Sequence, residues 1–281
     1  IGIKSKFLGN IKNINYEAKN IDIYKENPTS EFFGALGILS EFNLQKFQNN
    51  TNHLITPRIL VRYAPGSMRQ EEDGNRLNPI NAFSLNRLDN LNNYETGFSG
   101  TLGFDYKFKN DKKSFDFSVA QVINERENKK MHSKTSMDEK LSDLVGTSKY
   151  TINNNFSLNY NFSVDQNYSE LNYNEIGTDL DLGLMNLNFN YLQEKKHIGD
   201  QDYFKTKLEL KNSETGLFTF ENKRNLITNS SEFYNLSYEY INDCLRAGLV
   251  YRREFYNDSE LEPENSLMFK ITLTPFGNIN S

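Results

Sequence analysis

The sequence predicts an antiparallel transmembrane β-barrel, and three observations carry this prediction. Apolar and polar side chains alternate with a period of two over long stretches, as in strands whose two faces meet different surroundings. The alternating stretches run to about 9–12 residues, which is long enough to cross a bilayer when a strand is tilted. Short and long connections also alternate along the chain, as they do in outer-membrane barrels. We therefore expect about 12 strands in a single barrel domain that covers residues 1–281.

The composition agrees with a barrel and argues against other classes of protein. Of the 281 residues, 37% are hydrophobic and the mean hydropathy is −0.70, as expected when only one face of each strand meets lipid. The longest apolar run spans residues 32–39, whereas a membrane-spanning helix needs about 20 apolar residues. The 21 Phe and 16 Tyr argue against a disordered chain. A water-soluble β-sandwich is expected to have shorter strands, of about 5–6 residues.

The clearest strand lies at residues 94–108. Its even positions are mainly apolar and its odd positions mainly polar, so we expect one face toward lipid and the other toward the lumen. Leu102→Arg should then impair folding more than Thr101→Arg. The residues expected to face lipid are Tyr94, Phe98, Leu102, Phe104, Tyr106 and Phe108, and those expected to face the lumen are Glu95, Ser99, Asp105 and Lys107.

The same alternation returns in residues 156–164, 204–211 and 267–274. Cations fall on the polar side of the later strands, where they would meet an anionic sugar-phosphate or a plug protein. Glu209 lies among them, so a lumen wall of mixed charge is the other interpretation. The cations predicted to face the lumen are Lys205, Lys207, Lys211, Arg246, Arg252 and Lys270.

Connections of two lengths separate the strands. At residues 183–186 the apolar positions shift from even to odd, as a tight hairpin turn requires, and residues 212–216 and 241–245 also resemble short turns. Pro57 has no backbone donor, so we expect it to mark the start of a strand at residues 58–63. The longer polar segments are residues 66–81, 125–142, 195–202, 228–232 and 257–265.

Charge and reactive side chains exclude several activities. The net charge of −5 and the lack of a dense Lys/Arg stripe argue against a nucleic-acid partner. The three histidines, His53, His132 and His197, lie in separate segments without a Ser nucleophile motif, so we expect neither enzyme activity nor a cofactor. Cys244 is the only cysteine, which rules out an internal disulfide, and no Cys/His cluster has the spacing of a metal site.

Four segments, taken in order, also match a known pattern. They are TPRILVRYAPG at residues 56–66, FSLNRLDNLNNYETGFSGTLGFDY at 83–106, LSDLVGT at 141–147, and YEYINDCLRAGLVYRREFYNDSELEPENSLMFKITLTPFG at 238–277. Together they resemble the C-terminal barrel region of the LptD family, outer-membrane proteins that assemble lipopolysaccharide. The motifs are short, so their order carries the resemblance more than any one of them.

The resemblance implies a location, a function and partners. Proteins of this family lie in the outer membrane of Gram-negative bacteria, receive lipopolysaccharide from a periplasmic protein bridge, and release it sideways into the outer leaflet. The release gate is the seam between the first and last barrel strands. The barrel is plugged by the lipoprotein LptE and follows an N-terminal jelly-roll domain. On this resemblance, the sequence supplies roughly the second half of the barrel, without the jelly roll and the first barrel strands.

The resemblance implies a role for two features of the sequence. Residues 266–274 become the candidate gate strand, with Leu267, Phe269, Ile271 and Leu273 along it and Pro275 limiting its length. Family members of the well-known type carry two adjacent cysteines before the last hairpin, whereas this sequence has only Cys244 there. We expect Cys244 to bond to a cysteine in the N-terminal region that the family carries, and a free, packed thiol is the alternative.

Three rival functions remain at this stage. A porin would need a constriction loop folded inward, and a nutrient receptor would need an N-terminal plug. Neither feature is visible in the sequence. A soluble carbohydrate-binding β-protein would have shorter strands and no aromatic girdle facing lipid.

Overall fold

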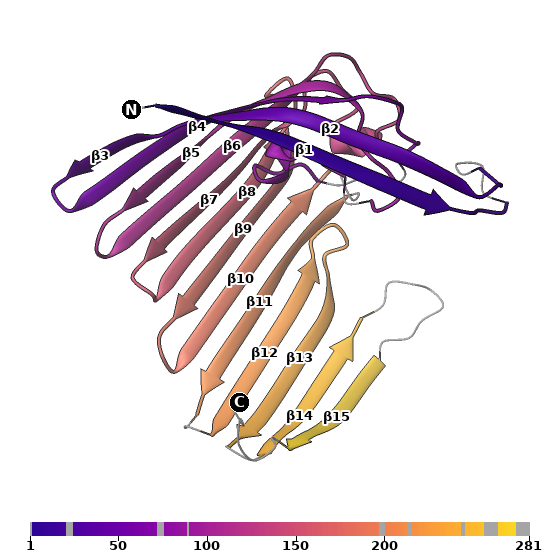
Figure 1. Cartoon of the computed structure of the whole chain (residues 1–281). Coiled ribbons are helices and arrows are strands. Elements are labelled where there is room, and N and C mark those ends of the chain that lie inside the picture. Colours follow the sequence, from indigo (N-terminus) through magenta and orange to yellow (C-terminus); the bar gives the residue numbers. More distant parts are fainter. Residues whose placement is uncertain are drawn as a thin grey trace, which may run out of the picture. The chain divides into compact units, whose positions relative to one another are not determined.

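The computed structural model describes residues 2–20, 25–71, 76–88, 90–196, 200–212, 215–242, 245–255 and 264–273. In these residues the chain is built from antiparallel strands and two short 3-10 helices, η1 (Asn81–Phe83) and η2 (Ser133–Thr135) (Figure 1). No helix within the described ranges has the length and apolar character needed to cross a membrane. The strands are β1 (Ile3–Tyr16), β2 (Thr29–Phe42), β3 (Leu44–Gln48), β4 (Thr51–Ala64), β5 (Gly97–Lys109), β6 (Lys113–Asn124), β7 (Leu144–Ile152), β8 (Phe156–Val164), β9 (Leu171–Asp181), β10 (Met185–Glu194), β11 (Gln201–Lys211), β12 (Gly216–Asn225), β13 (Ser230–Ile241), β14 (Leu245–Glu254) and β15 (Glu264–Leu273).

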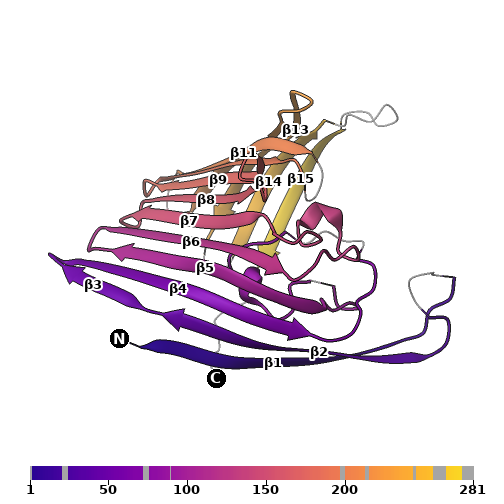
Figure 2. The ribbon, with the colours of Figure 1, turned by 90° about the horizontal axis from the view of Figure 1, so that it is seen from above.

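The strands form one sheet in which almost every strand pairs with its neighbours in sequence. The order runs β1-β2-β4 and then continuously from β5 to β15, while β3 pairs with β4 beside this path. β1 and β15 are therefore the two edge strands. Figure 2 shows β1 to β6 side by side, in the order that the pairing gives. This meander is the connectivity of an antiparallel barrel, so the predicted fold class is confirmed.

The structure has 15 strands in its described part, against about 12 expected from the pattern. One source of the difference lies near Asn43, which alone separates β2 from β3. The ladder of β2 with β4 ends at Glu41 opposite Arg58, and the ladder of β3 begins at Leu44 opposite Ile55. Pro57 falls in the gap between these two ladders, and on its other side it lies opposite Phe104 of β5. Pro57 therefore lies inside β4, and the prediction that it starts a strand is wrong.

The predicted short turns are confirmed. Residues 182–184 join β9 to β10, with Leu182 N–H donating to Met185 O at 2.8 Å and Gly183 in the left-handed region at φ +81°. The other two short turns close through Asn212 and Asn242, whose N–H groups donate to Gly216 O and Leu245 O, each at 2.9 Å. Longer connections lie at the opposite strand ends, after β4, β6, β8, β10 and β14. The connection after β12, where the sequence predicted a longer polar segment, has four residues, as many as the one after β11. The alternation of connection lengths seen in the sequence is thus a property of the fold.

The chain divides into two compact units, which are described separately. Unit 1 comprises Ile1–Tyr150, Tyr160–Asn174 and Glu194–Asp200. Unit 2 comprises Thr151–Asn159, Glu175–Gln193 and Gln201–Ser281.

The sheet of unit 1 has an apolar outer face, defined here by the exposed side chains of β5. Phe98, Leu102 and Phe104 are 45%, 47% and 39% exposed, whereas Ser99 and Thr101 on the opposite, inner face are buried. The register extends the outer face onto β4, where Ile59 lies opposite Leu102. The alternation predicted for β5 is therefore confirmed over the strand itself.

Tyr94 departs from that alternation. It was predicted to face lipid, but it is 1% exposed and stacks on Phe33, with ring centroids 6.0 Å apart. The reason is that β5 begins only at Gly97, whose φ of +115° breaks the extended pleat before the strand. Residues before Gly97 therefore do not continue the strand's parity, and Tyr94 belongs to the interior.

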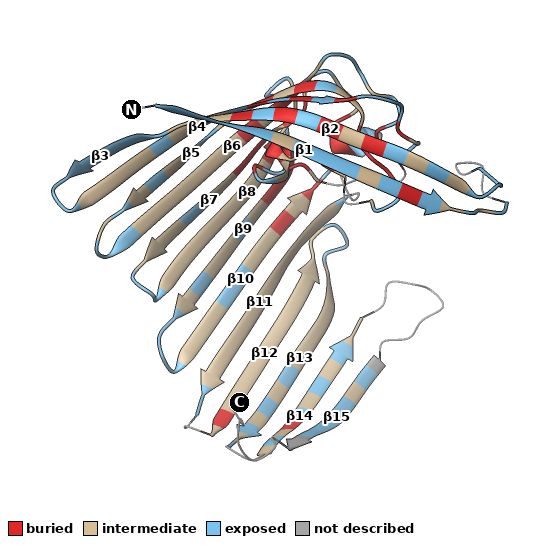
Figure 3. Ribbon diagram, in the orientation of Figure 1, coloured by how far each residue is buried: buried red, intermediate tan, exposed pale blue. Residues whose placement is uncertain are grey.

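Two long connections cover the inner face of unit 1. They are the β4–β5 loop, residues 65–96, and the β6–β7 loop, residues 125–143. In Figure 3 most buried residues of unit 1 gather toward the strand ends that these two loops connect. The loops and strands share one apolar core, made of Leu39, Leu60, Met68, Leu77, Ala82, Phe83, Ala120, Val122, Met131, Met137 and Val145.

Candidate functional site

The later strands of unit 2 present one polar and one apolar face. Residues that lie opposite each other in an antiparallel ladder share a face, so the register sorts the side chains. Lys207 lies opposite Glu221, which lies opposite Asn235, which lies opposite Arg252. The same register puts all six predicted lumen cations on this polar face: Lys205, Lys207, Lys211, Arg246, Arg252 and Lys270.

Acidic side chains on these strands pair with four of the six cations. Lys205 Nζ lies 2.6 Å from Glu221 Oε1, and Lys207 Nζ lies 2.6 Å from Glu209 Oε1. The remaining two pairs join Arg246 to Glu239 and Arg252 to Glu254. All of these side chains are partly exposed, so each pair stabilises the fold by at most about 1 kcal/mol. The surface is therefore a wall of mixed charge and not a purely cationic site.

The apolar face carries three of the predicted gate residues of β15. Leu267, Phe269 and Ile271 are 69%, 69% and 55% exposed and point to the same face as Leu249, which lies opposite Phe269. Leu273 is the last residue of β15 and lies opposite Leu245. Pro275 and Cys244 lie outside the described residues.

β15 is also an edge strand. Ten residue pairs join it to β14, from Leu245–Leu273 to Glu254–Glu264, and within the described part of the chain it has no second neighbour. Its other row of backbone N–H and C=O groups is thus open to another strand.

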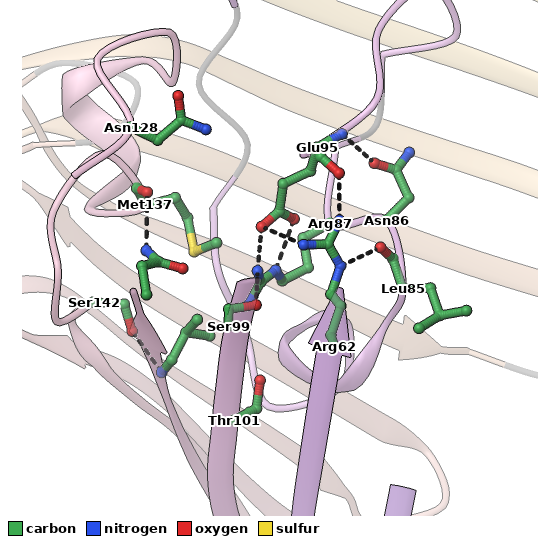
Figure 4. A network of polar contacts seen from close by, with 12 residues as sticks. Arg62, Leu85, Asn86, Arg87, Glu95, Ser99, Thr101, Asn128, Met137 and Ser142 are labelled. Carbon is green, nitrogen blue, oxygen red and sulfur yellow. Dashed lines mark hydrogen bonds and ion pairs between the residues drawn. The ribbon is translucent and has the colours of Figure 1, made fainter. Parts of the chain in front are cut away.

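A buried ionic cluster lies on the inner face of unit 1, and sequence reasoning missed it. Arg62 of β4 and Arg87 of the β4–β5 loop both pair with Glu95, and the three side chains are at most 4% exposed. Arg87 Nε donates to Glu95 Oε2 at 2.7 Å and Arg87 Nη2 donates to Ser99 Oγ at 2.9 Å. Arg62 Nε donates to Leu85 O at 2.6 Å. Figure 4 shows both guanidinium groups turned toward Glu95.

The cluster holds Glu95 ionised. Burial alone would raise the pKa of this carboxyl, but the charges of Arg87 and Arg62 and the hydrogen bonds from Arg87 outweigh it, so the pKa of Glu95 lies below its ordinary value. Burial raises the pKa of the neighbouring Tyr94 hydroxyl. Glu95 was predicted to face the lumen, and it does lie on the inner side, but it is covered by its own loop.

Further polar contacts attach the β4–β5 loop to other strands of unit 1. Arg69 pairs with Glu31 of β2, and Lys12 Nζ of β1 donates to Asn90 O at 3.1 Å and Asn93 O at 3.0 Å. The loop therefore contacts the edge hairpin β1–β2 from the inner side.

A second attachment reaches β9 and β10. Arg76 Nη2 donates to Glu194 Oε2 at 2.5 Å, and its guanidinium carbon lies 3.8 Å from the ring centroid of Tyr173. A long loop thus folds across the inner face. The available signal in the sequence was the pair Arg58 and Arg62, which lie with Leu60 on the same face of β4.

Thr101 is less tolerant than expected. It is 1% exposed, and its hydroxyl donates to Ala82 O of the β4–β5 loop at 2.9 Å. Arg at this position would displace the loop, so Thr101→Arg is expected to destabilise the protein through overpacking. The earlier assumption that Thr101 faces an open lumen is wrong.

The histidines are placed apart from each other. His53 Nδ1 lies 2.9 Å from Tyr106 Oη on the outer face, and His132 Nδ1 accepts from the N–H of Lys134. His197 lies outside the described residues. In the part of the chain that the structure describes, no group of three or more His, Cys, Asp and Glu side chains is arranged to hold a metal ion.

Comparison with known families settles the relationship. The LptD family, described as LPS transport system D, matches residues 29–243, which is most of the chain. The chain belongs to the LptD family. It is therefore an outer-membrane protein of lipopolysaccharide transport, as the resemblance of its segments implied.

The other comparisons give no further evidence about the family. No curated protein matches the chain. Among solved structures, a mutant of the Rh. blastica porin has a TM-score of 0.40 and 13% identity, covering 95% of this chain and 88% of the porin. A triple mutant of the Rhodopseudomonas blastica porin has a TM-score of 0.37 and 12% identity, covering 92% and 91%. Acinetobacter baumannii OccAB4 has a TM-score of 0.30 and 10% identity, covering 97% and 88%.

Proposed function

We propose that this LptD chain inserts lipopolysaccharide into the outer leaflet through a lateral seam at β15. The sugar portion passes along the polar face of unit 2, and the acyl chains leave to lipid beside the apolar face. The observation that carries the proposal is the geometry of β15, which has charged Lys270 and apolar Phe269 on opposite faces of a strand with an open edge.

The open edge gives a physical reason for a gate. Unpaired backbone groups in hydrocarbon cost several kcal/mol each, so this edge must be covered in the membrane. On the pattern of the family, the partner would be the first strand of the barrel. A seam in which few hydrogen bonds form can open at low cost. Lipopolysaccharide would leave through this seam, with its sugar on the polar face and its acyl chains in contact with lipid.

The proposal includes partners and excludes catalysis. A lipoprotein plug of the LptE type would contact the polar face, and a periplasmic protein bridge would deliver lipopolysaccharide through the N-terminal jelly roll. The chain transports its cargo without chemical change and needs no cofactor. A disulfide from Cys244 to that N-terminal region would hold it under the barrel, because the periplasm is oxidising.

The β4–β5 loop is the observation that favours a porin as the alternative. In a porin an inward-folded loop narrows an open pore, and here Arg69, Arg76 and Arg62 attach the loop across the inner face of unit 1. Membership of the LptD family favours lipopolysaccharide transport over this alternative.

Photo-crosslinking in cells tests the proposal. A photoreactive amino acid at Met268 or Thr219, both on the polar face, should capture lipopolysaccharide during its delivery. The same amino acid at Ile59, on the outer face of unit 1, is the matched control and should capture none. Capture at Ile59 but at neither polar position would contradict the proposed path, and so would free diffusion of small solutes through the purified protein.

A further inference from the structure

A cleft opens on the outer face of unit 1, at the end of the sheet where the short turns lie. Its volume is about 560 Å³, and it lies where β3 meets β4 and β5. The lining residues that matter here are Leu44, Lys46, Gln48, His53, Ile55 and Tyr106. The cleft belongs to neither the inner loop nor the polar face of unit 2.

One half of the cleft offers hydrogen-bond donors. Lys46 lies directly opposite His53 in the β3–β4 ladder, so their side chains share a face. His53 Nδ1 lies 2.9 Å from Tyr106 Oη. If the hydroxyl donates to Nδ1, the His53 Nε2–H remains for a ligand, and if Nδ1–H donates, the hydroxyl proton of Tyr106 remains. In either tautomer one donor stays available beside the Lys46 ammonium.

The charge of this half is not balanced nearby. Among the described residues, neither Lys46 nor His53 has a carboxylate within ion-pair distance, in contrast to the paired cations of unit 2. An anion is therefore the natural complement to this half of the cleft.

The other half is apolar and continues up the sheet. Leu44 lies opposite Ile55, and the two are 42% and 40% exposed. Beyond them the outer face continues through exposed Ile59, Leu102 and Phe104. A ligand with an anionic head and hydrocarbon chains matches this division.

The depth of the cleft in the membrane follows from its neighbours. Aromatic rings gather at this end of the outer face, as in the interfacial girdles of outer-membrane barrels. Phe104 and Phe117 lie 5.8 Å apart, Tyr106 and Phe115 6.1 Å, and His53 and Phe108 5.1 Å, between ring centroids. Short turns of such barrels face the periplasm, so the cleft lies at the headgroup level of the periplasmic leaflet.

We propose that this cleft binds one anionic phospholipid of the periplasmic leaflet. The phosphate lies between Lys46 and the His53–Tyr106 pair, and the acyl chains run from Ile55 along the outer face. The proposal is independent of lipopolysaccharide transport and requires only that the barrel lies in the outer membrane.

Native mass spectrometry of the whole protein in a nonionic detergent tests it. After delipidation, the protein is titrated with dihexanoyl-phosphatidylglycerol below its micelle concentration, and wild type should retain one molecule. Lys46→Glu should weaken this binding by roughly tenfold, because it reverses the charge beside the phosphate. The matched control is Lys109→Glu, since Lys109 lies opposite Asn52 at the same end of the sheet but on the inner face. It should bind as wild type does.

Two partial ligands test whether the cleft requires both the phosphate and the acyl chains. Dihexanoylglycerol, which lacks the phosphate, and inorganic phosphate, which lacks the chains, should each bind at least tenfold more weakly than the phospholipid. Equal binding by Lys46→Glu and Lys109→Glu, or equal binding of either partial ligand, would overturn the site. His53→Gln is the second variant, and it should weaken binding while the protein keeps the mobility of a folded barrel on unheated gels.

Discussion

Replacing Glu95 with Gln removes the anion that lies between two buried guanidinium groups. The side chains of Arg62 and Arg87 are each 1% exposed, so both buried cations would lose the carboxylate that they share. Breaking a buried ion pair by removing one partner costs about 3–5 kcal/mol. Gln keeps the shape and can still accept one hydrogen bond, so we expect Glu95→Gln to lower the free energy of unfolding by about 3 kcal/mol.

The assay is urea unfolding of the refolded protein in micelles, followed by far-ultraviolet circular dichroism because the chain has no Trp. Asp105→Asn is the matched control. Asp105 pairs with Arg58 at 3.3 Å on the same inner face, but these side chains are 26% and 19% exposed, so its loss should cost at most about 1 kcal/mol. Equal costs for the two substitutions would refute the reasoning from burial.

The pH dependence gives an independent check. The folded protein holds the pKa of Glu95 below its ordinary value of 4.5, so the ionised group stabilises the fold above that value. This stabilisation should decline as the pH falls through the lowered, folded-state pKa. The difference in unfolding free energy between wild type and Glu95→Gln should therefore be constant near neutral pH and shrink in acid. A difference that grows in acid would mean that Glu95 is not held as an anion.

Three further predictions follow from the faces and contacts of the sheet. Leu249→Arg, on the apolar face, should destabilise the folded barrel in bilayers by about 2–4 kcal/mol, whereas Val250→Arg on the polar face should fold nearly as wild type does; equal folding yields on unheated gels would contradict the assignment of faces. Arg69→Gln should release the β4–β5 loop from Glu31 and increase hydrogen exchange in the β1–β2 hairpin, and unchanged exchange would show that the pair does not hold it. In the full-length protein, Cys244→Ser should change the migration on non-reducing gels, and identical migration together with thiol labelling of Cys244 would exclude the bridge.

The sequence predicts the faces of strands well because side-chain direction in a strand has a period of two. Phe98 and Leu102 on β5, and Lys205 and Lys270 on the late strands, lie on the faces that their parity gives. The rule fails at Tyr94 because the strand has not yet begun there, and parity has no meaning across the positive φ of Gly97.

The folded loops could not be predicted in the same way. Met68, Leu77 and Phe83 reach the core of unit 1 from a connection without periodic pattern, so their burial depends on which strands they meet. The Arg62–Arg87–Glu95 cluster likewise joins residues whose contact is set by the fold of the loop. The mostly polar β4–β5 loop therefore contributes residues both to the apolar core and to the buried ionic cluster.

The central claim is that lipopolysaccharide leaves through the seam at β15, and a disulfide lock tests it most directly. In full-length protein carrying Cys244→Ser, one cysteine is placed on β15 and one on the facing first strand of the barrel. The control lock joins Leu236→Cys to Tyr251→Cys, which lie opposite each other in the β13–β14 ladder and are paired already.

The measured quantity is newly made lipopolysaccharide that reaches the cell surface. The account predicts that the seam lock stops delivery, that a reductant restores it, and that the control lock leaves it unchanged. Normal delivery with the seam fully crosslinked would contradict the account.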